Sequence, residues 1–287
     1  MSATTVAPQL FSVDVEEYFQ VNAMERVAPR DTWHSYPARL DASVRAILDM
    51  LDRRDARGTF FTLGWIAKHR PDTVRAIADA GHEIASHGYW HRKVTTLSPD
   101  EFREDVRTSK DELEQLTGRR VLCFRAPSFS IIRASEWALD VLVEEGYRYD
   151  SSRFPIRRPD YGSPHVPRVP HTVKCASGEL LEIPLATTQL FGTPFPAAGG
   201  GYLRQFPFSL IRRAFKESAA AGVPAMFYVH PWEVDPDQPR LPVSLITRVR
   251  HYRGLARMLP LMDRLLAEIP FTSVDAAFPN LVAERAA

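Results

Sequence analysis

The segment "RGTFFTLGWIAKHRPDTVRAIADAGHEIASH" (57–87) contains a strand, a helix and a second strand. Its first part, 57–64, is rich in aromatic and β-branched residues, which is typical of a buried strand. Pro71 and Gly81 mark the start and the end of a helix over 71–81, and 82–87 is the next strand. Two strands joined by a helix pair in parallel through a right-handed crossover, so this segment predicts an α/β fold.

The same alternation continues on both sides of this segment. The helix over 98–118 is the clearest, because Ser98 and Glu101 form a capping box and Gly118 ends it. Further strands are expected at 10–15, 121–125, 147–152, 179–186, 224–230 and 271–274, and further helices at 41–56, 135–146, 208–221 and near 244–268. This order favours a barrel or a doubly wound sheet, and the absence of GxGxxG after the first strand argues against dinucleotide binding.

The middle of the chain, 153–207, is rich in proline and contains Gly199-Gly200-Gly201, so we expect loops and short strands there. No repeat or low-complexity linker divides the chain. We therefore predict a single domain over 1–287, in which 240–287 supplies a completing helix and strand.

Composition excludes several classes of protein. The chain has 287 residues, a formal net charge of +1 and no dominant basic stripe, so nucleic acid is not an expected partner. Neither a signal peptide nor an apolar run of membrane-spanning length is apparent. We expect a cytoplasmic protein without a transmembrane segment, with the inner face of the membrane as an alternative place of action; the oligomeric state stays open.

Polar residues stand at the ends of several predicted strands, where a buried strand does not need them. The loops at the carboxyl ends of parallel strands build the active sites of α/β folds. Side chains from separate strands are therefore expected to converge on one mouth: Asp14, Glu16, His87, Arg125, Asp150 and His230, whereas Glu17 points to the opposite side if its strand stays regular.

A metal site is suggested by His87 and His91, which stand four residues apart. If the chain turns helically after its strand, both rings share a face and can bind a divalent ion; otherwise one caps a loop and the other is a surface residue. Asp14 and Glu16 face the same side of a strand, so one could bind the metal while the other acts as a base. His82 is expected to form a structural hydrogen bond.

Six segments in order resemble the motifs of the NodB-homology polysaccharide deacetylases, carbohydrate esterase family 4. They are "FSVDVEEYF", "TFFTLGWIA", "GHEIASHGYWH", "FRAPSFS", "YDSS" and "FYVHPWE", and they span about 10–235. The opening "DVEEYFQV", "GGGY" and "FYVHPWE" further resemble the subgroup associated with exopolysaccharide and exosortase systems. The resemblance implies a distorted (β/α) barrel of about seven strands and hydrolysis of acetyl groups on sugars with a zinc-like ion.

The resemblance also implies a role for each matching residue. Asp14 matches the catalytic base, Arg125 the arginine that pairs with it, and His87 and His91 the metal ligands. His230 matches the general acid, and Asp150 the carboxylate that orients His230. The family usually has two adjacent aspartates; here Val15 follows Asp14, so the acidic ligand is expected to be Glu16, with Glu17 as the alternative.

The expected chemistry is amide hydrolysis. A metal-bound water would attack the acetyl carbon, Asp14 would take its proton, and His230 would protonate the leaving amine. The backbone N–H of Ser128 is a candidate for the oxyanion, and Tyr202 and Trp232 are candidates for binding the apolar face of a sugar ring.

The favoured function is thus metal-dependent N-deacetylation of an amino-sugar polysaccharide or oligosaccharide in exopolysaccharide biosynthesis, with Zn²⁺ as the expected ion. Two alternatives stay open. One is a metal-independent hydrolase of a small cyclic amide on the same fold. The other is a non-catalytic carbohydrate-binding relative.

Overall fold

The computed structural model describes residues 7–158, 161–190 and 192–279. Its centre is a nine-stranded sheet in the order β10-β1-β2-β3-β4-β5-β7-β6, with β11 added beside β1. Within this sheet only β6 (His171–Cys175) is antiparallel to its neighbour, β7 (Gly178–Glu182). The other strands run parallel: β1 (Gln9–Val15), β2 (Thr59–Thr62), β3 (Glu83–Ser86), β4 (Cys123–Phe124), β5 (Tyr149–Asp150), β7, β10 (Met226–Val229) and β11 (Phe271–Thr272).

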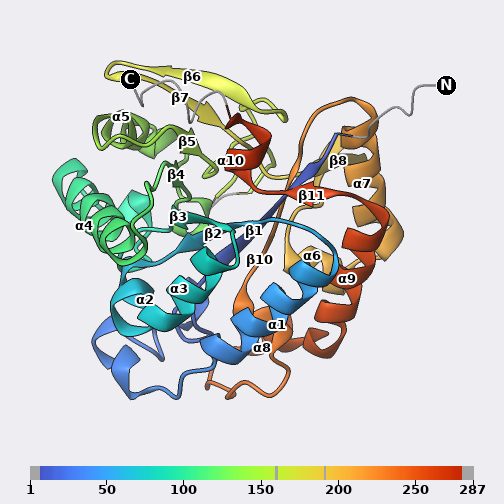
Figure 1. Ribbon diagram of the computed structural model, residues 1–287, viewed down its shortest axis with the longest axis horizontal. Coiled ribbons are helices and arrows are strands. Elements are labelled where there is room, and N and C mark those ends of the chain that lie inside the picture. Colours follow the sequence, from blue (N-terminus) through green and yellow to red (C-terminus); the bar gives the residue numbers. More distant parts are fainter. Residues whose placement is uncertain (1–6, 159–160, 191, 280–287) are drawn as a thin grey trace.

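Helices surround the strands, and Figure 1 shows them wrapped around the sheet. All seven residues of β1 are buried, as expected for the central strand of a parallel sheet covered on both faces. The covering helices are α1 (Leu40–Arg53), α2 (Gly64–His69), α3 (Pro71–Asp79), α4 (Pro99–Thr117), α5 (Trp137–Glu144), α6 (Gly200–Gln205), α7 (Phe208–Ala220), α8 (Leu245–Tyr252), α9 (Met258–Glu268) and α10 (Val274–Ala277).

The sheet curls toward a barrel. In the part of the chain that the structure describes, no continuous ladder joins its two ends. Two isolated parallel bridges, Leu185↔Met226 and Gly199↔Tyr228, nevertheless connect the chain after β7 to β10. The sheet is therefore a distorted barrel, in agreement with the predicted α/β class.

Local signals in the sequence placed most elements well. Ser98 and Glu101 form the expected capping box at the start of α4, and Gly118 ends that helix with a left-handed backbone. Two strands are much shorter than predicted, since β4 and β5 each have two residues. The Pro-rich segment 153–207 holds β6, β7 and a separate hairpin of β8 (Thr187–Leu190) and β9 (Thr193–Pro196), but also helix α6.

The prediction of one long helix near 244–268 is wrong. Gly254 has φ +78°, a left-handed conformation that interrupts an α-helix, and the chain forms α8 before it and α9 after it. The last predicted strand, 271–274, ends at Thr272 because Val274 begins α10. Single-domain organisation over 1–287 stays a prediction, and its ends, 1–6 and 280–287, lie outside the described residues. No helix among the described residues is both long and apolar enough to cross a membrane.

Candidate active site

A buried ion pair joins the ends of two strands. Asp14 is near the end of β1, and Arg125 directly follows β4. Arg125 is fully buried, and its Nη1 donates to Asp14 Oδ1 at 2.5 Å and to Ser12 Oγ at 3.0 Å. Its guanidinium also lies 3.9 Å from the centroid of the Phe61 ring. A buried charge requires such partners, so Arg125 holds the Asp14 carboxylate in one orientation.

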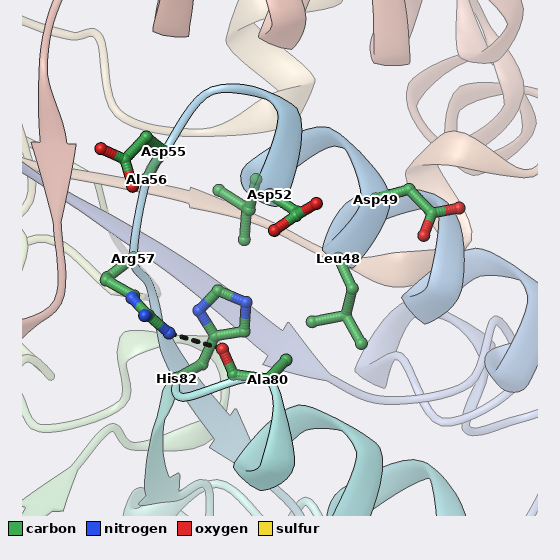
Figure 2. Close-up of a pocket in the computed structure, with 9 residues that line it drawn as sticks. Leu48, Asp49, Asp52, Asp55, Ala56, Arg57, Ala80 and His82 are labelled. Carbon is green, nitrogen blue, oxygen red and sulfur yellow. Dashed lines mark hydrogen bonds between the residues drawn. The ribbon is translucent and has the colours of Figure 1, made fainter.

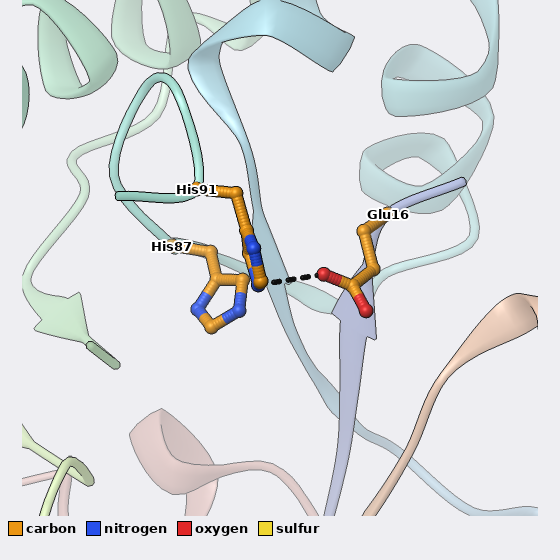
Figure 3. Close-up of side chains that lie close together, drawn as sticks. All are labelled: Glu16, His87 and His91. Atoms are coloured by element: carbon orange, nitrogen blue, oxygen red, sulfur yellow. Dashed lines mark ion pairs between the residues drawn. The ribbon is translucent and has the colours of Figure 1, made fainter. Parts of the chain in front are cut away.

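Next to this pair, Glu16, His87 and His91 converge from two segments, as Figure 3 shows. One nitrogen or oxygen atom of each lies within 4.8 Å of the others, and all three side chains are buried. His87 Nδ1 lies 2.8 Å from the carbonyl of Arg125. Because a carbonyl only accepts, Nδ1 carries the proton and Nε2 keeps its lone pair, as in metal-bound histidines.

The arrangement of these side chains suits a bound cation better than it suits hydrogen bonds among the three residues. Glu16 Oε2 is 2.8 Å from His91 Nε2, yet among the described residues neither Glu16 Oε2 nor His91 Nδ1 has a hydrogen-bond partner. Burial alone would raise the pKa of Glu16, but the nearby histidines, His91 first, lower it to about 2. Burial lowers the pKa of His87 to about 4. A carboxylate and a neutral imidazole are the states that bind a divalent metal.

The loop that carries the two histidines is not a helical turn, so that part of the prediction is wrong. Gly88 has φ +74° and His91 has φ +52°. The carboxylate of Asp105, on α4, accepts from the backbone N–H of Tyr89 at 2.8 Å and of Trp90 at 3.3 Å. The rings of His87 and His91 still face the same site, with centroids 5.2 Å apart, because the two left-handed residues fold the loop back on itself.

Replacing Gly88 with alanine is expected to destabilise the protein and weaken metal binding. A Cβ at this position would lie 2.6 Å from Asp105 Oδ2, and the left-handed backbone alone costs about 1–2 kcal/mol. Gly118→Ala is the matched control, since Gly118 has φ +66° and its Cβ would meet nothing within 4 Å. Urea unfolding and zinc titration should show a larger loss for Gly88→Ala. Equal losses would contradict this account of the loop.

His230 follows β10 and points its ring into the same site. Its Nε2 lies 3.9 Å from Asp14 Oδ2 and 3.7 Å from Glu16 Oε1. Its Nδ1 is 3.1 Å from Glu233 Oε2. Although burial lowers the pKa of His230, the hydrogen bond to Glu233 and the carboxylates of Glu16, Glu233 and Asp14 raise it to about 9. These carboxylates therefore favour the protonated imidazole, the form that can donate a proton.

Glu233 was not predicted as a site residue. It lies in the 3-10 helix η6 (Pro231–Val234), is 1% exposed, and accepts from Arg204 Nε at 3.0 Å. Burial would raise its pKa, but His230 and Arg204 lower it to about 2, so it is ionised. The motif "HPWE" could have predicted this contact, because a glutamate three residues after His230 can reach back to it across one helical turn.

Asp150, the predicted partner of His230, has a different role in the structure. Its carboxylate accepts from Ser152 Oγ at 2.5 Å and from Ser152 N at 3.2 Å, and Ser152 Oγ accepts from Ala126 N at 2.8 Å. Ser151 accepts from Arg125 through both its carbonyl and its hydroxyl, at 3.3 and 3.0 Å. The "YDSS" segment thus supports Arg125 and the chain that follows it. The carboxylate that contacts His230 Nδ1 is that of Glu233.

The predicted substrate-binding residues differ in their surroundings. Trp232 is 7% exposed, stacks on His230 and on His251, and donates through Nε1 to Glu16 Oε1 at 3.2 Å. It therefore positions the cluster and has little free surface for a sugar, which corrects the prediction. Tyr202 is half-buried beside Phe206, and Ser128, with φ +56°, accepts from Asn22 Nδ2 at 2.6 Å. Their roles stay predictions.

Two other acidic and basic candidates lie outside the cluster. The carboxylate of Glu17 accepts from the backbone N–H groups of Arg39 and Leu40 at the start of α1, so Glu16 is the residue that joins the histidines. His82 precedes β3, whereas His87 follows it. His82 lines a separate cavity (Figure 2), whose volume is about 350 Å³. Its Nδ1 accepts from Gly58 N at 3.3 Å, as expected of a structural histidine.

Comparison with known proteins gives two adjoining family matches. Residues 32–149 match the model of polysaccharide deacetylases, and residues 151–279 match a domain of unknown function, DUF3473. The site uses both segments, because His87, His91 and Arg125 lie in the first and His230 and Glu233 in the second. Asp14 and Glu16 precede both.

Curated relatives match part of the chain. It is 28% identical over 102 residues to the peptidoglycan-N-acetylmuramic acid deacetylase PdaA of Bacillus subtilis, covering 36% of this chain and 38% of the relative. It is 33% identical over 95 residues to a peptidoglycan-N-acetylglucosamine deacetylase of Bacillus cereus, covering 33% and 34%. The matches thus span little more than a third of the length of these relatives.

The fold is shared more widely than the sequence. A Mycobacterium smegmatis protein crystallised as a candidate polysaccharide deacetylase superposes with a TM-score of 0.63 at 19% identity, over 97% of this chain and 92% of that one. This similarity extends the shared architecture beyond the segments in which the sequences align.

Proposed function

We propose that this protein is a metal-dependent hydrolase that removes N-acetyl groups from an amino-sugar polysaccharide or oligosaccharide, and the match of residues 32–149 to the polysaccharide deacetylase model supports this. One observation carries the proposal. The cluster of Glu16, His87 and His91 lies beside the Asp14–Arg125 pair and faces His230, so metal ligands, a base and an acid share one site.

Glu16, His87 and His91 would hold the divalent ion, for which we expect Zn²⁺. Two imidazoles and one carboxylate are a common donor set for catalytic zinc, and the buried Glu16 Oε2, which accepts no hydrogen bond from the described residues, supports the assignment. When bound, the ion supplies Lewis acidity, which lowers the pKa of a water molecule and polarises the acetyl carbonyl.

Asp14 is the residue placed to accept the proton of the attacking water. Arg125 donates to its Oδ1, whereas its Oδ2 faces His230. The second oxygen is therefore directed toward the site. The Arg125 guanidinium is the opposite charge that this buried carboxylate needs, and it fixes the orientation of Asp14. Ser151 fixes the guanidinium from the other side.

His230 is the residue placed to protonate the departing amine. Its Nε2 faces the carboxylates of Asp14 and Glu16, while Glu233 holds its Nδ1. A protonated imidazole with a carboxylate behind it keeps the correct nitrogen directed at the leaving group. An amine leaves from carbon only when its nitrogen gains a proton, so this step is required of any amide hydrolase.

The names of the relatives support the proposed substrate class. PdaA and the Bacillus cereus enzyme are named for N-acetylated sugars of peptidoglycan, and the shared chemistry supports an N-acetylated glycan here. We place the protein in exopolysaccharide biosynthesis on the resemblance of its opening, "GGGY" and "FYVHPWE" segments. We also propose that the chain forms one catalytic domain, since both family segments contribute to the site.

Zinc removal is expected to abolish acetate release from N-acetylated oligosaccharides, and zinc addition to restore it. His87→Ala should lose the metal itself, measured by elemental analysis of the purified protein independently of activity. His165→Ala is the control, because His165 is exposed and pairs with Glu136. Activity on a cyclic amide that survives chelation would favour the metal-independent alternative. Glycan binding without acetate release would favour the non-catalytic one.

A further inference from the structure

Helix α8 carries an apolar stripe that faces away from the protein. Leu245 is 75% exposed, Ile246 66% and Val249 44%. At 100° per residue, Leu245 and Val249 lie along one line of the helix and Ile246 lies beside it. The buried residues of α8 are His251 and Tyr252. The helix therefore packs inward through two aromatic side chains and leaves a separate apolar surface uncovered.

Positive charge borders this stripe on both sides. By helical spacing, Arg248 lies on one side of it and Arg250 on the other, and both are exposed. Arg240, Arg253 and Arg257 stand nearby in the chain, and 238–262 contains no aspartate or glutamate. In the described part of the chain, Arg248 and Arg250 take part in none of the ion pairs. The charge is thus uncompensated locally.

The inner side of α8 is built into the wall of the active site. His251 stacks on Trp232 with centroids 4.0 Å apart, and Trp232 donates to Glu16. Arg204, which holds Glu233, donates to the backbone carbonyls of Arg250 and Arg253. Figure 1 shows α8 at the outside of the molecule. A surface bound by α8 therefore lies close to the catalytic residues.

We infer that α8 binds the surface of an anionic membrane, with Leu245, Ile246 and Val249 inserted among the lipids and the arginines against the headgroups. Short amphipathic helices with aliphatic residues bordered by arginine bind membrane interfaces in this way. Three side chains are too few for a stable protein interface, which needs about 800 Å² per partner. The inference does not depend on the proposed activity, but it would bring a lipid-linked glycan to the site.

Vesicle sedimentation with the full chain tests the inference. We expect binding to phosphatidylcholine vesicles that contain about one third phosphatidylglycerol, and much weaker binding to pure phosphatidylcholine. Arg248→Gln/Arg250→Gln should lower the partition coefficient between vesicles and solution by about tenfold or more, because each arginine adds to the electrostatic attraction to the anionic surface. Leu245→Ser/Ile246→Ser/Val249→Ser should also release the protein. Circular dichroism checks that both variants stay folded.

Matched variants separate this role from general effects. Arg53→Gln/Arg133→Gln removes two exposed arginines elsewhere, and Val169→Ser removes a similarly exposed valine; neither should change partitioning. Equal binding to neutral and anionic vesicles, or unchanged binding of the α8 variants, would overturn the inference. So would a dimer in solution that the triple serine variant dissociates, because a second copy of the chain would then cover the stripe.

Discussion

Replacing Asp14 with asparagine is expected to lower kcat for acetate release by about 10²- to 10⁴-fold, the usual contribution of a general base. Asparagine keeps an oxygen that can accept from Arg125 but cannot take a proton from water. Metal content should be unchanged, since Asp14 is outside the cluster of Glu16, His87 and His91. Steady-state kinetics and elemental analysis on the same preparation measure both.

Asp49→Asn is the matched control, because Asp49 is an exposed carboxylate on α1 that lines the cavity in Figure 2. Its activity should equal that of the unmodified protein. A fully active Asp14→Asn variant would remove Asp14 from the role of base. A variant that also loses its metal would instead make Asp14 part of the metal site.

Replacing Glu233 with glutamine is expected to lower kcat by about 10²-fold or more with a small change in KM, because the carboxylate behind a catalytic histidine acts mainly in the transition state. Glutamine can still accept from Arg204, so the fold should persist. The pH profile gives an independent reading. Glu233 raises the pKa of His230, which must be protonated to act, so its loss should move the alkaline limb of kcat to lower pH.

Asp150→Asn separates the two candidate partners of His230. Asp150 contacts Ser152 rather than His230 among the described residues, so this variant should keep the alkaline limb of the unmodified protein. A shift of that limb in Asp150→Asn but not in Glu233→Gln would restore the role that the family resemblance implies for Asp150. The position of the limb decides between them even if both variants lose activity.

The polar residues at the strand ends could be recognised as site candidates because a buried strand does not otherwise need charged side chains. An apolar run such as "LFSVDV" predicts a buried strand, and acidic residues at its end indicate a functional site. Asp14 and Glu16 could therefore be assigned to a site shared with the other strand ends. Parallel pairing then placed His87 and Arg125 beside them. This inference did not require the spatial distances between these segments, since the carboxyl ends of parallel strands lie at the same edge of the sheet.

The errors came from contacts that local patterns do not determine. Spacing of four residues suggested a helical turn for His87 and His91, but left-handed residues produced the same convergence. Resemblance assigned Asp150 to His230, whereas a nearer carboxylate, Glu233, was available three residues away. Trp232 was predicted to bind a sugar ring, but His251 of α8 stacks on it and covers it. Each depends on how elements pack, which the sequence specifies only through the whole fold.

The strand that carries Asp14 has partners from distant parts of the chain. β1 pairs with β2, but also with β10 and β11, and Ser12 donates to the carbonyl of Phe227, 215 positions away. During synthesis, β1 emerges early and must wait for these partners while its apolar residues stay exposed. Asp14 can therefore reach its final position only after translation has passed β10 and β11, so formation of the site is a late step in the folding of this chain.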